Sequence, residues 1–283
     1  MNWIIAQNQS DDILASGITT LTNSPKNNFD LTNCSTGYGN YLIESLELRY
    51  IGEATNLKKR LKQHSKPNSS TFFKNYIKAR NENPMLPQQL EIEDFSLRTM
   101  ETFFGRKEIE EFGIVNLPAN LNRFQKGKRK KYIKTQDKSL WADIQAKSDE
   151  LLETGSKTLS TLKYKNWDDS EPVNYAGIYI IEHPKNGVIY IGESSNVLGR
   201  YGSHNDRAYI SALRRNIARD ILGYSLSVQN GKRRFLSDIE ERGVSKYLSS
   251  CRYKSSRIDL GRCELEEYLI RQEEPLLNRK VNK

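Results

Sequence analysis

The sequence has 283 residues, enough for two compact domains of about 140 residues each. Its net charge of +9 favours a polyanionic partner without naming one. Its three cysteines have neither the spacing of a zinc site nor that of a disulfide framework. No apolar run reaches the roughly 18 residues of a membrane span, and no signal-peptide pattern opens the chain. We therefore expect reduced cysteines and a cytoplasmic protein.

The first predicted element is an N-terminal helix that the sequence contains twice. The residues of this helix recur later at one constant spacing: Trp3, Gln7, Leu14 and Gly17 match Trp141, Gln145, Leu152 and Gly155. The spacing of the apolar residues predicts a short amphipathic helix that ends near Gly17, or near Gly155 in the second copy. We interpret this helix as part of each repeat, and the sequence leaves its packing partner open.

A β-hairpin is predicted over residues 38–52. Tyr41 and Tyr50 are an odd number of residues apart, which places both phenols on the same face of the sheet when the loop is even-numbered. A basic helix begins at Leu57, and its Arg60 and His64 share one face because they are four positions apart. The hairpin and helix therefore gather two phenols, a guanidinium and an imidazole.

The rest of the first repeat contains a second helix, a strand and a third helix. Around residues 71–80 an aromatic trio has helical spacing, for which we expect a core role rather than stacking on bases: Phe72, Phe73 and Tyr76. A strand is predicted near residues 90–97, before a helix that carries Glu110 and a segment that ends at Asn122. Residues 125–134 then hold six positive charges and none negative, which predicts a solvated linker.

The second copy begins near Ser139 and repeats this plan. Its hairpin and helix hold four residues in the same order and spacing: Tyr179, Tyr190, Arg200 and His204. Further on, GRCELEEYLIRQEEPLLNR aligns without a gap with GRKEIEEFGIVNLPANLNR, so that Glu266 matches Glu110 and Asn278 matches Asn122. Extra residues fall around 221–256. Such an excursion either carries specificity determinants or has no role.

These motifs resemble the signature of the GIY-YIG nuclease family. The second copy has GIY at residues 177–179 and YIG at 190–192, followed by the arginine, histidine, glutamate and asparagine in the family's order. The first copy departs from the pattern at Asn40, which replaces the isoleucine, and at Pro118, which stands one position early. The resemblance implies an α/β (α+β) fold, with a small three-stranded antiparallel sheet and flanking helices in each repeat. We predict repeat 1 over residues 1–126, a basic linker over 127–138 and repeat 2 over 139–283.

The resemblance also implies a role for each residue of the motif. Phosphodiester hydrolysis needs an activated water and stabilisation of charge on the phosphate, which one Mg²⁺ or Mn²⁺ ion per site supplies with few protein ligands. The resemblance implies that Glu110 and Glu266 bind the metal and that Arg60 and Arg200 contact the phosphate. It implies a general base from Tyr41 with His64 and from Tyr179 with His204. Tyr50 and Tyr190 are expected to position the water or phosphate, and Asn122 and Asn278 to order the site. A histidine could itself take the proton, so the choice between tyrosine and histidine as base stays open.

The sequence as a whole is most like a GIY-YIG restriction endonuclease. We expect a magnesium-dependent enzyme whose two sites cut opposite strands of double-stranded DNA, and a monomer, because the repeats form an intramolecular pseudo-dimer. Cations outside the motif are expected to contact DNA: Lys128, Arg129, Lys130 and Lys131 in the linker, and Arg214 and Arg215 in repeat 2. Two alternatives are a structure-selective repair or recombination nuclease, and a DNA-binding protein in which only repeat 2, or neither repeat, is catalytic.

Overall fold

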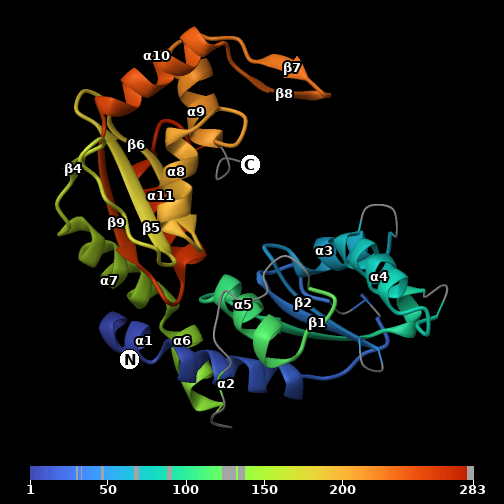
Figure 1. Ribbon diagram of the computed structural model, residues 1–283. Helices are drawn as coiled ribbons and strands as arrows, with labels where there is room; N and C mark the ends of the chain where they lie inside the picture. The colour runs from blue at the N-terminus through green and yellow to red at the C-terminus, as the bar shows by residue number, and fades with distance from the viewer. Residues whose placement is uncertain are drawn as a thin grey trace. The chain divides into compact units, whose positions relative to one another are not determined.

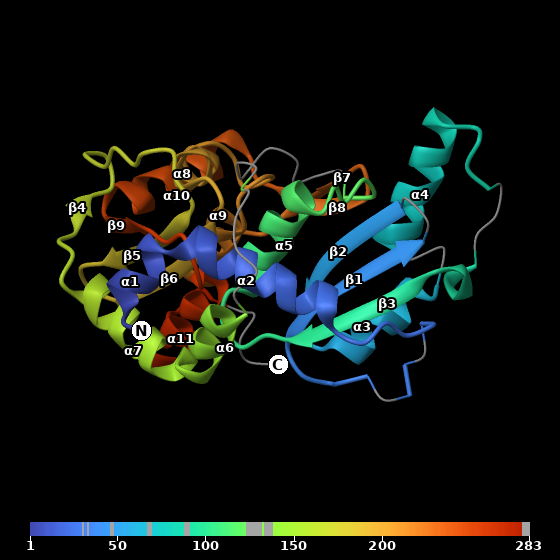
Figure 2. The same cartoon turned by 90° about the horizontal axis from the view of Figure 1, so that it is seen from below.

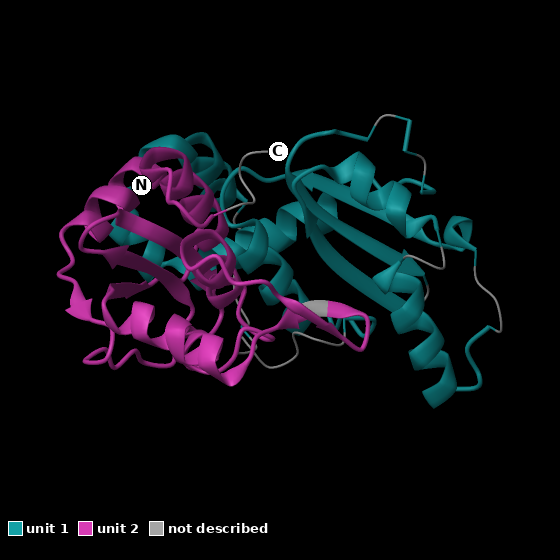
Figure 3. Cartoon of the chain, turned by 90° about the horizontal axis from the view of Figure 1, so that it is seen from above, with its two compact units in different colours: residues 1–151 teal, residues 152–283 magenta. Residues whose placement is uncertain are grey.

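The computed structural model describes residues 1–278 apart from 30, 33, 46–47, 67–69, 88–90, 123–131, 133–137 and the side chain of Arg233. The chain forms two compact units, Met1–Leu151 and Leu152–Lys283 (Figure 3). Each unit contains its own antiparallel sheet (Figure 1), so the predicted α/β class and tandem architecture are confirmed. In the part of the chain that the structure describes, no helix is long and apolar enough to cross a membrane.

Unit 1 is built on a three-stranded sheet in the order β2-β1-β3. Its elements are α1 (Trp3–Asn8), α2 (Ser10–Asn23), β1 (Gly39–Ser45), β2 (Leu48–Ala54), α3 (Leu57–His64), α4 (Thr71–Glu82), the 3-10 helix η1 (Ile92–Asp94), β3 (Ser96–Glu101), α5 (Arg106–Asn116) and α6 (Ser139–Ala146). Helices α2 and α5 cover one face of the sheet, and α3 and α4 cover the other (Figure 2). The sheet is therefore buried on both faces.

The aromatic trio of α4 lies in the core between this helix and the sheet, as predicted: Phe72, Phe73 and Tyr76 are at most 5% exposed. The strand predicted near residues 90–97 begins later, at Ser96. Glu91 and Asp94 form a reciprocal capping box, which holds residues 92–94 in the turn η1 and delays the strand. The predicted strand exists, but its predicted start near residue 90 is wrong.

The duplicated N-terminal segment forms two helices in each copy rather than one. Gly17 lies inside α2, so the prediction that the helix ends there is wrong. A Cβ atom at Gly17 would stand 2.5 Å from Ile109 and 2.6 Å from the ring of Trp141. The glycine therefore permits close packing on the helix, and it does not act as a C-terminal cap.

Helix α6 belongs to repeat 2 by sequence but packs within unit 1. Trp141 is buried, and its backbone N–H donates to Ser16 Oγ at 3.1 Å. Gln145 Oε1 accepts from the N–H groups of Phe103 and Phe104 at 2.7 and 3.1 Å, while its Nε2 donates to the Phe104 carbonyl at 2.9 Å. The partner that the sequence left open for this helix is thus the α2–α5 layer of repeat 1.

Unit 2 has the corresponding sheet with one added strand, in the order β4-β9-β5-β6. Its elements are α7 (Ser148–Ser160, which begins in unit 1), β4 (Lys165–Asn166), β5 (Gly177–His183), β6 (Gly187–Ser194), α8 (Val197–Asn205), α9 (Ala212–Asn216), the π-helix η2 (Ile217–Ile221), β7 (Ser227–Gln229), β8 (Lys232–Phe235), α10 (Asp238–Ser249), β9 (Arg252–Arg257) and α11 (Arg262–Glu273). Strand β4 adds only two residues to β9. The extra residues of repeat 2 thus form β7, β8 and α10, whereas β9 is the counterpart of β3, because it pairs with β5 as β3 pairs with β1.

Candidate active site

The two motif tyrosines of each repeat lie on the same face of the sheet. Tyr41 and Tyr50 stack with ring centroids 6.3 Å apart and planes at 29°. Tyr179 and Tyr190 stack at 6.1 Å and 27°. The prediction from their odd spacing is confirmed in both hairpins.

The glycine that follows the second tyrosine makes room for the first. Gly52 pairs directly with Tyr41 across the hairpin, and Gly192 pairs with Tyr179. A Cβ atom would stand 2.2 Å from the Tyr41 hydroxyl at Gly52 and 2.3 Å from the Tyr179 hydroxyl at Gly192. Since this is far inside van der Waals contact, the motif needs glycine at this position to seat the phenol.

A capped helix brings a histidine to each first tyrosine. Asn56 and Asn196 accept a backbone N–H at the N-termini of α3 and α8, which fixes where each helix begins. His64 Nε2 then lies 2.7 Å from the Tyr41 hydroxyl. His204 Nε2 lies 3.0 Å from the Tyr179 hydroxyl. The predicted phenol–imidazole pair is therefore in hydrogen-bond contact in both units.

A buried serine completes this chain of hydrogen bonds. Ser70 Oγ lies 2.9 Å from His64 Nδ1, and Ser211 Oγ lies 2.8 Å from His204 Nδ1. Each serine also caps the next helix, accepting a backbone N–H from Phe73 at 3.3 Å or from Arg214 at 3.1 Å. We refer to Tyr41–His64–Ser70 and Tyr179–His204–Ser211 as the Tyr–His–Ser relays.

These serines were not among the predicted site residues, although the sequence carries a signal for them. Both repeats have a serine followed five residues later by an asparagine, in Ser70 to Asn75 and in Ser211 to Asn216. The asparagines also act alike, because Asn75 donates to the carbonyl of Leu121 at 2.8 Å and Asn216 donates to that of Leu277 at 2.9 Å. Each pair marks a capped helix tied to the C-terminal segment of its repeat.

Both histidines are neutral at physiological pH. Burial, and then the nearby Arg60 or Arg200, lowers the pKa of His64 and of His204 to about 3. A neutral imidazole has one N–H, so each relay admits two proton arrangements. In one, the serine hydroxyl donates to Nδ1 and the Nε2 proton points at the phenol oxygen. In the other, Nδ1–H donates to the serine and Nε2 accepts the phenol proton.

The first tyrosines carry protonated phenols in the free protein. Burial raises the pKa of Tyr41 and of Tyr179 well above its ordinary value. The positive charge of Arg60 or Arg200 opposes this shift without cancelling it, and Arg200 itself is exposed on α8. A phenol in this setting can act as a base only if its own proton moves to a neighbour, and the imidazole is that neighbour.

The two motif glutamates differ in their surroundings. Glu110 is 9% exposed, burial raises its pKa, and Lys107 Nζ lies 3.4 Å from Glu110 Oε2. Glu266 Oε1 accepts the backbone N–H of Glu193 at 3.1 Å, and Cys263 takes the place of the lysine. A desolvated carboxylate is stabilised by a cation, so Glu110 fits a divalent ion. Glu266 is half-buried at the matching position and offers the same carboxylate oxygens. In the described residues no group of three or more His, Cys, Asp and Glu gathers into a separate metal site.

A family model described as the GIY-YIG catalytic domain matches residues 37–112 and 175–282, which together make up more than half of the chain. Each matched segment holds both motif tyrosines, the histidine and the glutamate of one repeat. The chain belongs to the GIY-YIG family. Its two GIY-YIG domains make it a nuclease, and the family implies a DNA substrate. No curated protein and no solved structure matches the chain.

The asparagine of each GIY-YIG domain binds the edge strand of the sheet. Asn122 Nδ2 donates to the Ile51 carbonyl at 2.7 Å, and its Oδ1 accepts the Ile51 N–H at 2.9 Å. Asn278 makes the same pair of hydrogen bonds with Ile191, at 2.7 and 2.9 Å. The side chain thus substitutes for a neighbouring strand and ties the chain after the glutamate helix to the central residue of YIG.

The departure from GIY in the first domain lies away from the chemistry. Asn40 alternates with Tyr41 along β1 and so points to the opposite face of the sheet. Its Nδ2 donates to the carbonyls of Arg106 at 2.9 Å and Gly52 at 3.4 Å. The asparagine therefore ties the start of α5 to the sheet, and the tyrosine beside it keeps the geometry of its counterpart.

The predicted DNA contacts outside the motif have different outcomes. Arg214 is 1% exposed, and its guanidinium pairs with Glu241 at 2.7 Å and donates to the His204 carbonyl at 3.2 Å. Because this charge is buried and paired inside unit 2, the expectation that Arg214 contacts DNA is corrected. Arg215 is half-buried near Tyr190. Lys128, Arg129, Lys130 and Lys131 of the linker lie outside the described residues.

A cavity of about 210 Å³ in unit 2 is not the active site. It lies beside β9 and is lined by Lys163, Lys165, Tyr175 and Ser255 among others. None of the motif residues lines it. The motif tyrosines and His204 lie instead together on the sheet face that α8 covers.

Proposed function

We propose that this protein is a magnesium-dependent type II restriction endonuclease whose two GIY-YIG domains cut opposite strands of duplex DNA. The observation that carries the proposal is the repetition of one whole cluster. Each unit assembles a Tyr–His–Ser relay, a second tyrosine, an arginine and a glutamate. A chain with two such clusters has the parts for two strand cleavages within one polypeptide.

In the proposed reaction, a water molecule attacks the phosphorus while the first tyrosine takes its proton. The bond from phosphorus to the 3′ oxygen breaks, and this oxygen takes up a proton from solvent. The phenol passes its own proton to the histidine Nε2, which lies 2.7 Å away in unit 1 and 3.0 Å away in unit 2. In this proposal, tyrosine and histidine act together as the base. The serine holds the imidazole ring in line through Nδ1.

The remaining residues support the phosphate. Arg60 and Arg200 offer permanent positive charge beside the phenols, suited to the non-bridging phosphate oxygens. Glu110 and Glu266 would hold Mg²⁺, which when bound stabilises charge on the phosphate and on the leaving 3′ oxygen. Burial and then Glu110 raise the pKa of Tyr50, and burial and then Glu266 raise the pKa of Tyr190. Each second tyrosine also stacks on the first, so it is suited to orienting the attacked phosphate.

The test removes one carboxylate at a time. Glu266→Gln and Glu110→Gln should each convert supercoiled plasmid to open circle and stop there, with the two nicks mapped to opposite strands of one site. The double variant should bind DNA without cutting it, and EDTA should abolish cleavage by the parent. Glu273→Gln, an exposed position on the same helix as Glu266, serves as the matched control and should linearise plasmid at the parental rate.

Three results would contradict parts of the proposal. If Glu110→Gln still linearised plasmid at the parental rate, repeat 1 would take no part in cleavage and two chains would be needed for a double-strand cut. If both single variants lost all nicking, the sites would be coupled rather than independent. Full activity in EDTA would remove the metal assignment of Glu110 and Glu266.

One observation favours a second candidate, in which only repeat 2 is catalytic. The Lys107 ammonium occupies one oxygen of Glu110 at 3.4 Å, and repeat 2 has Cys263 at this position. A lysine bound to the carboxylate competes with a metal ion for it. Lys107→Cys in the Glu266→Gln background should then raise the nicking rate of repeat 1 at low Mg²⁺. An unchanged Mg²⁺ dependence would show that the lysine does not limit metal binding.

A further inference from the structure

Repeat 2 carries a two-stranded ribbon that stands apart from its sheet. Among the described residues, strands β7 and β8 pair only with each other, and Figure 1 shows them extending away from α9 and α10. The turn between them is Asn230-Gly231, with φ of 50° and 70°. Two consecutive left-handed residues make the tight type of turn that matches the strand twist, so the ribbon is a preformed element. We call residues 227–235 the ribbon.

The composition of the ribbon suits nucleic acid. It contains Lys232, Arg233 and Arg234 and no acidic residue. Val228 is 61% exposed, and Gln229, Asn230 and Arg234 are also exposed. These four exposed side chains, which are one apolar group, two amides and a guanidinium, do not contribute to the hydrophobic core. They are the groups that contact the thymine methyl, adenine and guanine edges in the major groove.

The base of the ribbon is anchored next to the active site of unit 2. Phe235 stacks on Tyr209 at 4.9 Å and 22°, and the Lys232 Nζ lies 5.7 Å from the centre of the Tyr209 ring. Arg215 fixes the turn that holds this tyrosine, donating to the Tyr209 carbonyl at 3.1 Å. Burial raises the pKa of Tyr190 on the catalytic face, and the charge of Arg215 opposes this rise. The pKa of Arg215 is itself lowered by burial and then by Arg234 of the ribbon, so Arg215 lies within electrostatic range of both. Cationic groups therefore run from the catalytic tyrosines to the ribbon.

We propose that the ribbon enters the major groove of duplex DNA beside the phosphate held by repeat 2, and that Gln229, Asn230 and Arg234 read base edges there. The width of that groove, about 12 Å, admits a two-stranded ribbon. The inference rests on the proposed nuclease function and adds the element that selects the sequence.

The ribbon also makes the readout asymmetric. Between α4 and β3 of unit 1, the described residues contain η1 and no strand. Two identical readers would select a palindrome, whereas a reader present in one repeat selects different bases in the two halves of the site. The recognition sequence of this protein is therefore non-palindromic, with the half beside repeat 2 the more strictly defined.

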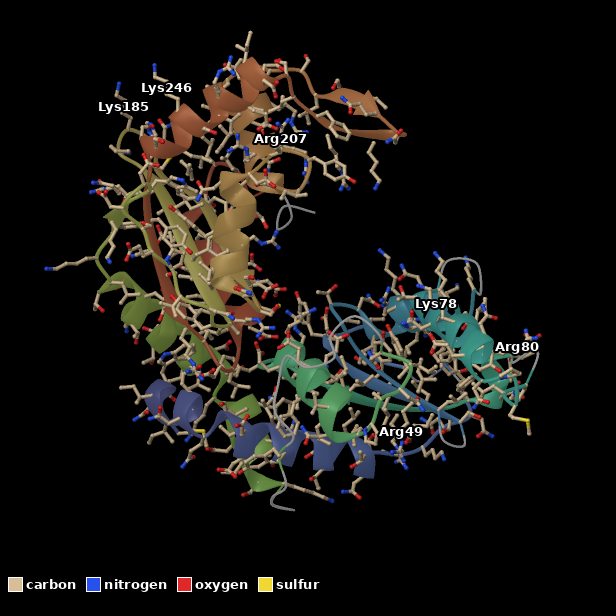
Figure 4. All side chains as sticks on the ribbon, viewed as in Figure 1. Arg49, Lys78, Arg80, Lys185, Arg207 and Lys246 are labelled. Atoms are coloured by element: carbon tan, nitrogen blue, oxygen red, sulfur yellow. The ribbon has the colours of Figure 1, made fainter. Side chains whose placement is uncertain are left out.

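The test compares base preference and affinity in a background that cannot cut. Randomised duplexes would be selected by the Glu110→Gln/Glu266→Gln protein, with and without Gln229→Ala/Arg234→Ala. The ribbon variant should lose roughly 10- to 100-fold in discrimination at two or more adjacent base pairs of one half-site. Arg234→Lys keeps the charge and should lose preference for its base while retaining most of the affinity. Lys185→Ala removes an exposed cation at the turn between β5 and β6, away from the ribbon (Figure 4), and should leave the preference unchanged.

The outcomes separate this inference from the nuclease proposal. If the parent with Mg²⁺ cuts at a defined sequence and the ribbon variant selects the same sequence, the ribbon does not read bases and only this inference fails. A uniform loss of affinity with unchanged preference would assign the ribbon to phosphate contact and also overturn it. A palindromic selected site would refute the asymmetry. If the parent neither cuts nor binds DNA, both proposals fall together.

Discussion

Burial of the relay histidine makes unit 2 sensitive to acid. The pKa of His204 is lowered from its ordinary 6.5 to about 3 by burial and by Arg200 and Arg214. The unfolded chain therefore takes up the proton first as the pH falls. The stability lost begins near pH 6.5, grows until about pH 3 and is then constant. At pH 5 the cost is about 2 kcal/mol, since each pKa unit between the two states corresponds to about 1.4 kcal/mol.

The substitution His204→Gln removes the titrating group and keeps an amide at the site. The measurement is the change in the free energy of unfolding between pH 8 and pH 5, from urea titrations followed by hydrogen exchange of unit 2. The variant should lose about 2 kcal/mol less than the parent over this interval, whatever its stability at pH 8. The comparison of two pH values in each protein separates the titration from any packing defect.

His183→Gln is the matched control, because His183 lies in the β5–β6 hairpin outside the relay and stacks on Tyr247. It should retain the full pH dependence of the parent. Equal pH dependence in His204→Gln and the parent would refute the reasoning, because a histidine that titrates normally when folded contributes no such difference. A direct NMR titration should show the His204 ring neutral down to pH 5.

Three further predictions concern the active site. Ser211→Ala should lower the cleavage rate of repeat 2 roughly tenfold with little effect on DNA affinity. Its control is Ser237→Ala, which removes the corresponding N-cap of α10. Each substitution should cost ~1 kcal/mol of stability, but Ser237→Ala should leave cleavage unchanged. Gly192→Ala should lower the cleavage rate by about 100-fold, because its Cβ displaces the Tyr179 hydroxyl, whereas Gly202→Ala, with no atom within 4 Å of its Cβ, should cleave normally. Arg200→Lys keeps the charge but loses the planar two-point contact, so cleavage should fall much more than binding; parental cleavage would make Arg200 an ordinary surface charge.

The sequence predicted the parts of the site that depend on local periodicity. An odd spacing in a hairpin fixes the face of Tyr41 and Tyr50, and a spacing of four fixes the shared face of Arg60 and His64, whatever else the chain does. The gapless alignment of the two C-terminal segments predicted that Glu110 and Glu266 occupy matching positions in the two repeats. These relations hold because strand and helix periods act over a few residues.

The errors arose where tertiary contacts decide the role of a residue. Gly17 has the sequence signature of a helix end, but the ring of Trp141 needs the space at its Cα. Arg214 resembles an exposed cation of a basic helix, but Glu241 from α10 pairs with it in the interior. Ser211 is recognisable as a helix cap, yet its contact with His204 depends on how α8 and α9 fold against each other. The first two partners are distant in sequence, and the third contact, although only seven residues long, depends on the packing of two helices.

The packing of α6 in unit 1 limits where the chain can be truncated between its two repeats. The duplicated segment starts near Ser139, whereas the compact unit ends at Leu151, so the unit of duplication and the unit of folding differ by one helix. A clone that stops at residue 126 would encode the first repeat but leave the α2 surface around Gly17 without its tryptophan.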